Sequence, residues 1–193
     1  HWAYATAVQA LGWIITGLLR GVVPDVLSVV LGNGCIVLSL IFYMAIIAEF
    51  LQQRFSLRYW HLGLLLLLPT LAYFTSIQND VAIRTAMISL MFTSIAYRSV
   101  MLLASTRLQA MPSCRFMIGL YAFCGSFMLV RVGYFLFVST DPNQLPFSGS
   151  GFKDASLIIF YLFSALLPFG FVLMCNDRYV AQHSQVEHQL REK

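Results

Sequence analysis

Six long stretches of nearly uncharged, apolar residues occupy most of this chain of 193 residues. Stretches of about 18 or more such residues are typical of helices that span a lipid bilayer. Charged residues make up only 10% of the chain, whereas soluble domains carry roughly 25%. We therefore expect an all-α integral membrane bundle of about six transmembrane helices, at residues 2–19, 26–48, 60–77, 81–103, 116–138 and 155–175.

The distribution of arginines predicts how this bundle lies in the membrane. Cytoplasmic loops are enriched in Lys and Arg, and if six helices alternate, most basic residues fall on one side. Those on the richer side are Arg54, Arg58, Arg98, Arg107, Arg115, Arg178, Arg191 and Lys193, against Arg20, Arg84 and Lys153 on the other. We expect a multi-pass protein of a bacterial inner membrane, with both ends of these residues in the cytoplasm. Because His1 and Trp2 already stand in an apolar stretch without a Met, we also expect a segment upstream.

No catalytic or metal-binding motif is recognisable. The chain has no HExxH, no glycine-rich phosphate loop, no CxxC pair and no Ser/His/Asp set. A haem would need two histidines facing each other within the membrane, but His1 and His61 both fall at inner helix ends. The small positive net charge reflects loop arginines and does not indicate nucleic-acid binding. We expect no catalytic residue, metal or cofactor in these residues, although a membrane enzyme stays open.

One charge stands inside an apolar stretch. Arg131 lies in "FMLVRVGYFLF", about seven residues before the predicted outer end of its helix. Its side chain could reach the outer headgroups by snorkelling. Alternatively it faces a polar pocket, because arginines within a membrane usually face the bundle interior or a water-filled cavity.

Counting depth from the outer helix ends favours the pocket. The residues expected in one polar layer with Arg131 are Asn33, Thr70, Ser89 and Tyr161, with Arg84 near the mouth. Asp25, Asp80 and Asp141 lie at the outer ends and could pair with Arg84 or Arg131. No acidic residue lies deeper, so we expect Arg131 to bind the anionic head of a small or lipid-like ligand.

Small residues predict where helices pack closely. Gly32 and Gly34 mark one such face on the second helix, and Ala122, Ser126 and Gly133 mark one on the fifth. Arg131 falls nearly opposite that second face. We therefore expect the fifth helix to be central, with protein on both sides.

The sixth helix is expected to continue into a polar tail, residues 176–193. A spacing of four and three residues links Val172, Asn176, Tyr179, His183, Val186 and Leu190. This is the seam of a parallel coiled coil, and it predicts a homodimer whose register Asn176 sets. The alternative is a solvated helical tail without a partner.

The stretch "RGVVPDVLSVVLGN", Arg20–Asn33, resembles the membrane region of bacterial membrane-anchored diguanylate cyclases, and "FGFVLMCNDR", Phe169–Arg178, resembles the junction before their GGDEF output domain. The resemblance implies a sensor bundle, residues 1–175, followed by a cytoplasmic signalling helix, residues 176–193. The GGDEF motif is absent here, so cyclase activity, with its GTP and Mg²⁺, would belong to a parent protein. A histidine-kinase sensor module and a small-molecule transporter are the alternatives.

Overall fold

The computed structural model describes residues 2–105, 111–138 and 151–191, with Lys153, Asp154 and residues 185–191 described by their backbone only. The described residues form helices and short connections, and none of them belongs to a strand. The helices are α1 (Trp2–Gly17), α2 (Asp25–Phe50), α3 (Arg58–Ser76), α4 (Val81–Ala104), α5 (Pro112–Gly133) with its π-helical continuation η2 (Tyr134–Val138), and α6 (Gly151–Arg191).

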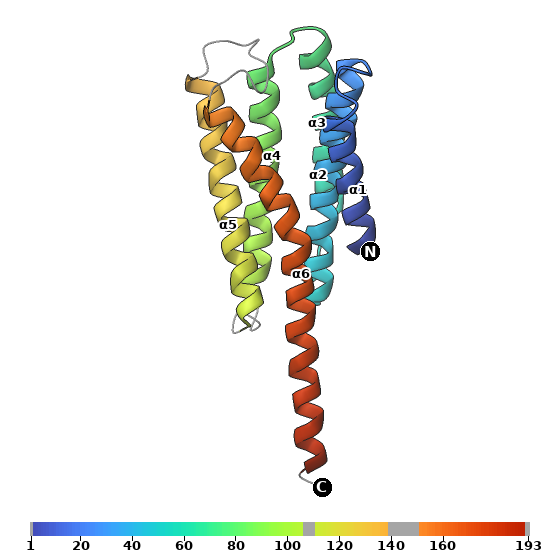
Figure 1. Cartoon of the computed structure of the whole chain (residues 1–193), viewed down its shortest axis with the longest axis vertical. Coiled ribbons are helices and arrows are strands. Elements are labelled where there is room, and N and C mark those ends of the chain that lie inside the picture. Colours follow the sequence, from blue (N-terminus) through green and yellow to red (C-terminus); the bar gives the residue numbers. More distant parts are fainter. Residues whose placement is uncertain (1, 106–110, 139–150, 192–193) are drawn as a thin grey trace.

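The helices lie side by side along the long axis of the molecule, and successive helices run in opposite directions (Figure 1). α1 packs along α2, and α4 packs along α5. α3 contacts α2 and α4, while α6 contacts α5. The second half of α6 continues beyond the end of the bundle (Figure 1).

Four helices are long and apolar enough to span a membrane: Asp25–Phe50, Val81–Ala104, Pro112–Phe137 and Ala155–Ser184. By this criterion the chain is a membrane protein, but the predicted count of about six spans is not confirmed. α1 has 16 residues, which at 1.5 Å per residue cover about 24 Å, less than the roughly 30 Å of a hydrocarbon core. α3 is long enough, but Tyr59, Trp60 and His61 in its first turn make it less apolar.

The largest differences from the predicted helix bounds lie in the last two helices. α5 begins at Pro112, four residues earlier than predicted, because a proline is well tolerated in the first turn of a helix. α6 does not end near residue 175. It is one helix of 41 residues that includes Pro168 and the tail, so the bundle and the predicted signalling helix share one continuous element.

The centre of the bundle is α2. Ile36, Val37, Ile41, Met44 and Ile47 are each at most 2% exposed. The expectation of a central fifth helix was wrong. α5 has an exposed apolar face that includes Phe123 and Val130, because its packed side faces only α4 and α6.

Glycines bring α1 and α2 into close contact. A β-carbon added at Gly12 would lie 3.0 Å from the carbonyl oxygen of Gly32, and one added at Gly32 would collide with the hydroxyl of Thr16. On α5 the glycine in contact is Gly125, which faces Ala96, whereas nothing lies within 4 Å of a β-carbon at Gly133. The small-residue prediction was therefore right for Gly32 and wrong for Gly133.

Candidate functional site: a cavity lined by three arginines

A cavity of about 350 Å³ lies among α1, α2, α4, α5 and α6. It lies toward the end of the bundle that holds the α1–α2 connection, and α3 contributes none of its lining. Its walls are formed by Trp13, Thr16, Gly17, Arg20, Val29, Asn33, Ile36, Val81, Arg84, Thr85, Ile88, Phe92, Arg131, Phe135, Leu157, Phe160 and Tyr161. No acidic residue is among these lining residues, but three arginines are.

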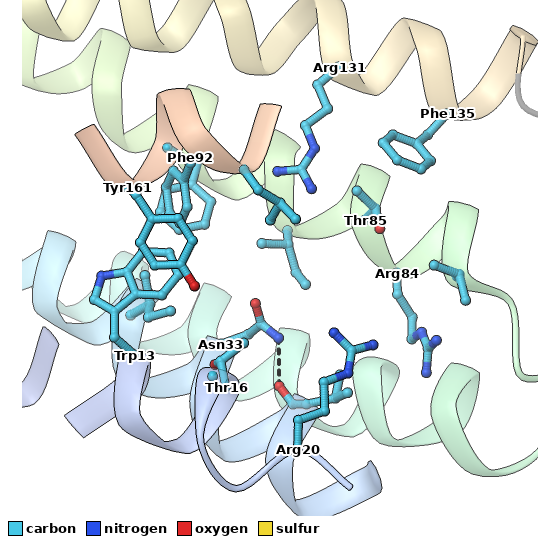
Figure 2. A pocket seen from close by; sticks show the side chains of 17 residues that line it. Trp13, Thr16, Arg20, Asn33, Arg84, Thr85, Phe92, Arg131, Phe135 and Tyr161 are labelled. Atoms are coloured by element: carbon cyan, nitrogen blue, oxygen red, sulfur yellow. Dashed lines mark hydrogen bonds between the residues drawn. The ribbon is translucent and has the colours of Figure 1, made fainter. Parts of the chain in front are cut away.

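Arg131 enters the cavity from the last turn of α5, and its guanidinium points toward the centre (Figure 2). The guanidinium carbon lies 5.6 Å from the centre of the Phe135 ring. The Nε atom is buried and has no hydrogen-bond partner among the residues that the structure describes. A buried cation donor without a partner is costly, so this site favours an anion that supplies the missing acceptor.

Arg84, in the first turn of α4, is 8% exposed. Its charge interacts with that of Arg20 and with the carboxylates of Asp25 and Asp80. The Asp80 carboxylate also caps α4, where its Oδ1 accepts a hydrogen bond from the Ile83 amide at 3.0 Å. The acidic groups expected at the mouth therefore lie near Arg84 and Arg20, whereas Arg131 forms no ion pair with any described side chain.

The polar wall opposite Arg131 comes from α1 and α2. The Asn33 Nδ2 donates a hydrogen bond to the Val29 carbonyl oxygen at 2.7 Å, and its amide oxygen is turned toward the cavity (Figure 2). Thr16 lines the same wall, although its hydroxyl donates to the Gly12 carbonyl oxygen at 2.8 Å. Each side chain spends one donor on its own helix and keeps its oxygen as an acceptor for a ligand.

Aromatic rings form another wall of the cavity (Figure 2). The ring centres of Trp13 and Tyr161 lie 4.1 Å apart, and those of Trp13 and Phe160 lie 5.1 Å apart. Phe92 continues the wall, 4.7 Å from Phe160. Because these rings already pack against one another, the wall is formed before any ligand arrives, and it suits an apolar body.

The cavity brings together four of the six predicted ligand-binding residues: Arg131, Asn33, Arg84 and Tyr161. It does not include Ser89, which is fully buried and donates to the Thr85 carbonyl oxygen at 2.7 Å. Thr70 lies on α3, away from the cavity, and donates to the Leu66 carbonyl oxygen at 2.6 Å. Counting residues from a helix end gives depth alone, so it could not tell which way these two hydroxyls point.

Sequence reasoning missed Arg20, Trp13 and Thr85 as lining residues. Arg20 was assigned to an outer connection, but the turn at Gly21, whose φ is +84°, returns that connection over the bundle end. The signal that could have found it is the "RGVVPD" turn itself, which places a cation next to the predicted mouth.

The predicted seam residues of the tail lie on the exposed part of α6. Asn176, Tyr179 and His183 are exposed, and the His183 ring lies 6.1 Å from that of Tyr179. The side chains of Val186 and Leu190 lie outside the described residues.

Where α6 leaves the bundle, two neighbouring residues bind the ends of two other helices. Asp177 Oδ2 accepts a hydrogen bond from the Ser113 amide at the start of α5, at 3.2 Å. Arg178 Nη1 donates one to the Phe50 carbonyl oxygen at the end of α2, at 2.9 Å. A helix start favours an acceptor and a helix end a cation, so both contacts are complementary. Sequence analysis did not foresee either contact.

Among the described residues, no three His, Cys, Asp or Glu side chains are grouped so as to hold a metal ion. In the comparisons with known proteins, no family model, no curated protein and no solved structure matches this chain. The candidate site therefore rests on its own geometry.

Proposed function

We propose that this chain is a transmembrane signal-input module. It binds the anionic head of a small or lipid-like ligand in the cavity and passes a change in helix packing along α6 to a cytoplasmic output domain. One observation carries the proposal. Leu157, Phe160 and Tyr161 of α6 form a wall of the cavity, and the same helix continues without a break to Arg191.

The ligand follows from the chemistry of the walls. Arg131 offers a charge-assisted hydrogen bond from inside the bundle, and Arg20 and Arg84 add positive charge. The aromatic wall of Trp13 and Tyr161 offers apolar contact. A carboxylate or phosphate carried on an apolar body fits both walls, and about 350 Å³ is within the range of small-molecule pockets.

Transmission is supported by the contacts at the exit of α6. Asp177 binds the start of α5, which carries Arg131, and Arg178 binds the end of α2, which carries Asn33. A ligand held between Arg131 and Asn33 pulls on α5 and α2 at one end of the bundle. Because both helices are attached to α6 at the other end, their movement shifts α6 where it leaves the bundle.

Several finer features belong to this proposal. All six helices cross a bacterial inner membrane, the cavity opens toward the periplasm, and the C-terminal part of α6 lies in the cytoplasm. The output domain is a diguanylate cyclase, as the resemblance implies, and it supplies the GTP and Mg²⁺ chemistry. A dimer suits this output because two cyclase active sites must meet to join two GTP molecules.

Tryptophan fluorescence tests the ligand. The chain is reconstituted in phosphatidylcholine nanodiscs with Trp2→Phe and Trp60→Phe, which leaves Trp13 as the reporter in the cavity wall. We expect decanoate to change the emission of Trp13 saturably and decanol, with the same chain and no charge, to leave it unchanged. Benzoate separates the sources, because it responds only if a small soluble anion is enough.

Two variants decide whether the response comes from the cavity. Arg131→Ala removes a charged donor worth about 1.5–3 kcal/mol, so the affinity for decanoate falls roughly tenfold to a hundredfold. Arg98→Ala is the matched control, because Arg98 is an exposed arginine of α4 outside the cavity. Equal affinities of the two variants, or equal responses to decanoate and decanol, would contradict the ligand proposal.

The output is tested separately with the natural full-length gene. We expect its expression to change cellular cyclic di-GMP, and Arg131→Ala to fix that level independently of ligand. Autophosphorylation with unchanged cyclic di-GMP would point to the histidine-kinase alternative. Ligand uptake into proteoliposomes that contain this chain would point to the transporter.

A further inference from the structure

One face of α6 is exposed along its whole described length. Its apolar members Ile158, Leu162, Phe169, Val172 and Tyr179 are between 49% and 65% exposed. Ala165, Asn176 and His183 complete the face and are also exposed. In chain order the eight residues are spaced four, three, four, three, four, three and four, so the seam of the tail continues upward through the bundle.

The opposite face of the same helix packs on the bundle. Phe160, Phe163, Leu167, Gly170 and Met174 are all buried. At 3.6 residues per turn, these residues lie nearly half a turn away from the exposed face. A β-carbon at Gly170 would collide with the sulfur of Met117, so α5 lies close against that side. α6 is therefore held to its own bundle on one side and unoccupied by described residues on the other.

Lipid accounts for the upper part of this exposed face, but not for the whole. The helix leaves the bundle near Arg178, which is attached to the last residue of α2, and beyond it the same face presents Tyr179 and, by sequence, Val186 and Leu190. Apolar side chains at a coiled-coil spacing in water call for a partner helix. Because the face is continuous, the partner that covers its lower part also lies against its upper part.

Asn176 indicates which partner this is. It stands on the exposed face at the lower end of the predicted span, where lipid offers its amide no hydrogen bond. In a parallel two-stranded coil it occupies an a position and meets the same residue of the second strand. A two-fold axis along the exposed face thus satisfies Asn176 with its own copy, whereas an unrelated partner would need a matching polar group at that height.

We propose that two copies of this chain form a parallel dimer along the entire exposed face of α6, from Ile158 within the bundle to Leu190 in the tail. The dimer seam is thus a transmembrane interface continuous with the coiled coil, and the cavity of each copy lies beside it. This assignment does not depend on the ligand or on the output domain.

Disulfide crosslinking of the chain in native membranes tests the seam. In a background with all four native cysteines replaced by Ala, single cysteines are placed at Leu162 and Phe169. Leu166 is the matched control, an exposed leucine of the same helix that lies about a quarter turn from the seam. Phe123, an exposed phenylalanine of α5, controls for random collision.

We expect Leu162→Cys and Phe169→Cys to crosslink several-fold more than Leu166→Cys and Phe123→Cys on mild oxidation. Equal crosslinking at all four positions would mean random collision and would overturn the proposal. Crosslinking at Tyr179→Cys without any at Leu162→Cys or Phe169→Cys would also overturn it, because the contact would then be confined to the tail. Single-molecule photobleaching of the cysteine-free chain in nanodiscs provides an independent count, and we expect two copies per disc.

Discussion

Arg178 on α6 donates a hydrogen bond to the carbonyl oxygen of Phe50, the last residue of α2, at 2.9 Å. The guanidinium carbon also lies 5.0 Å from the centre of the Phe50 ring. The last carbonyls of a helix have no partner within that helix, so Arg178 satisfies one of them and places a cation at the negative end of the helix dipole. A pair of residues 128 positions apart thereby attaches the outgoing helix to the central helix of the bundle.

Replacing Arg178 by Ala should loosen this attachment. We expect hydrogen exchange in α6 near the exit to become faster, by an amount that corresponds to about 1–2 kcal/mol for a charged, partly exposed hydrogen bond. Exchange measured by mass spectrometry in nanodiscs checks this. Arg98→Ala serves as the control and should leave exchange unchanged. If both variants exchange like the wild type, α6 is held by its apolar contacts alone.

Arg131→Leu should keep the protein folded while abolishing the response to decanoate. The buried Nε has no described partner, so removing the charge also removes its desolvation cost and no bond within the described residues is lost. We expect a thermal midpoint equal to or above that of the wild type. Arg131→Lys should recover the response only in part, because lysine lacks the planar fork. A marked loss of thermal stability in Arg131→Leu would assign Arg131 a structural role instead.

Gly32→Ala should destabilise the bundle, because the added methyl group collides with Thr16 across the contact between α1 and α2. Overpacking of this kind costs about 1–3 kcal/mol. The matched control is Gly119→Ala in α5, where nothing lies within 4 Å of the new carbon. Thermal unfolding followed by circular dichroism should show a lower midpoint for Gly32→Ala only. Equal midpoints for the two variants would mean that α1 can move away from α2 without cost.

The predicted topology can be checked by labelling in whole cells. In the cysteine-free background, Asn143→Cys in the connection after η2 should react with a membrane-impermeant maleimide, because that connection is expected in the periplasm. Arg58→Cys at the start of α3 should react only after the cells are opened. The reverse pattern would invert the bundle in the membrane and place the cavity mouth on the cytoplasmic side.

The sequence by itself determined that this is an all-helical membrane protein, where most of its helices lie, and that Arg131 is the charge that needs an explanation. These properties depend on apolar length and on depth along one helix, both of which are local in the chain. Depth also brought Asn33, Tyr161 and Arg84 into consideration correctly as cavity-lining residues.

Only the tertiary structure decided which side of each helix faces the cavity. That orientation depends on how neighbouring helices are rotated and how closely they approach, as at Gly12 and Gly32. It turned Ser89 into the core and left Thr70 on a helix that does not reach the cavity, while it brought Arg20 in from a connection. Rotation about a helix axis is set by contacts between residues far apart in the chain, which a count along one helix does not contain.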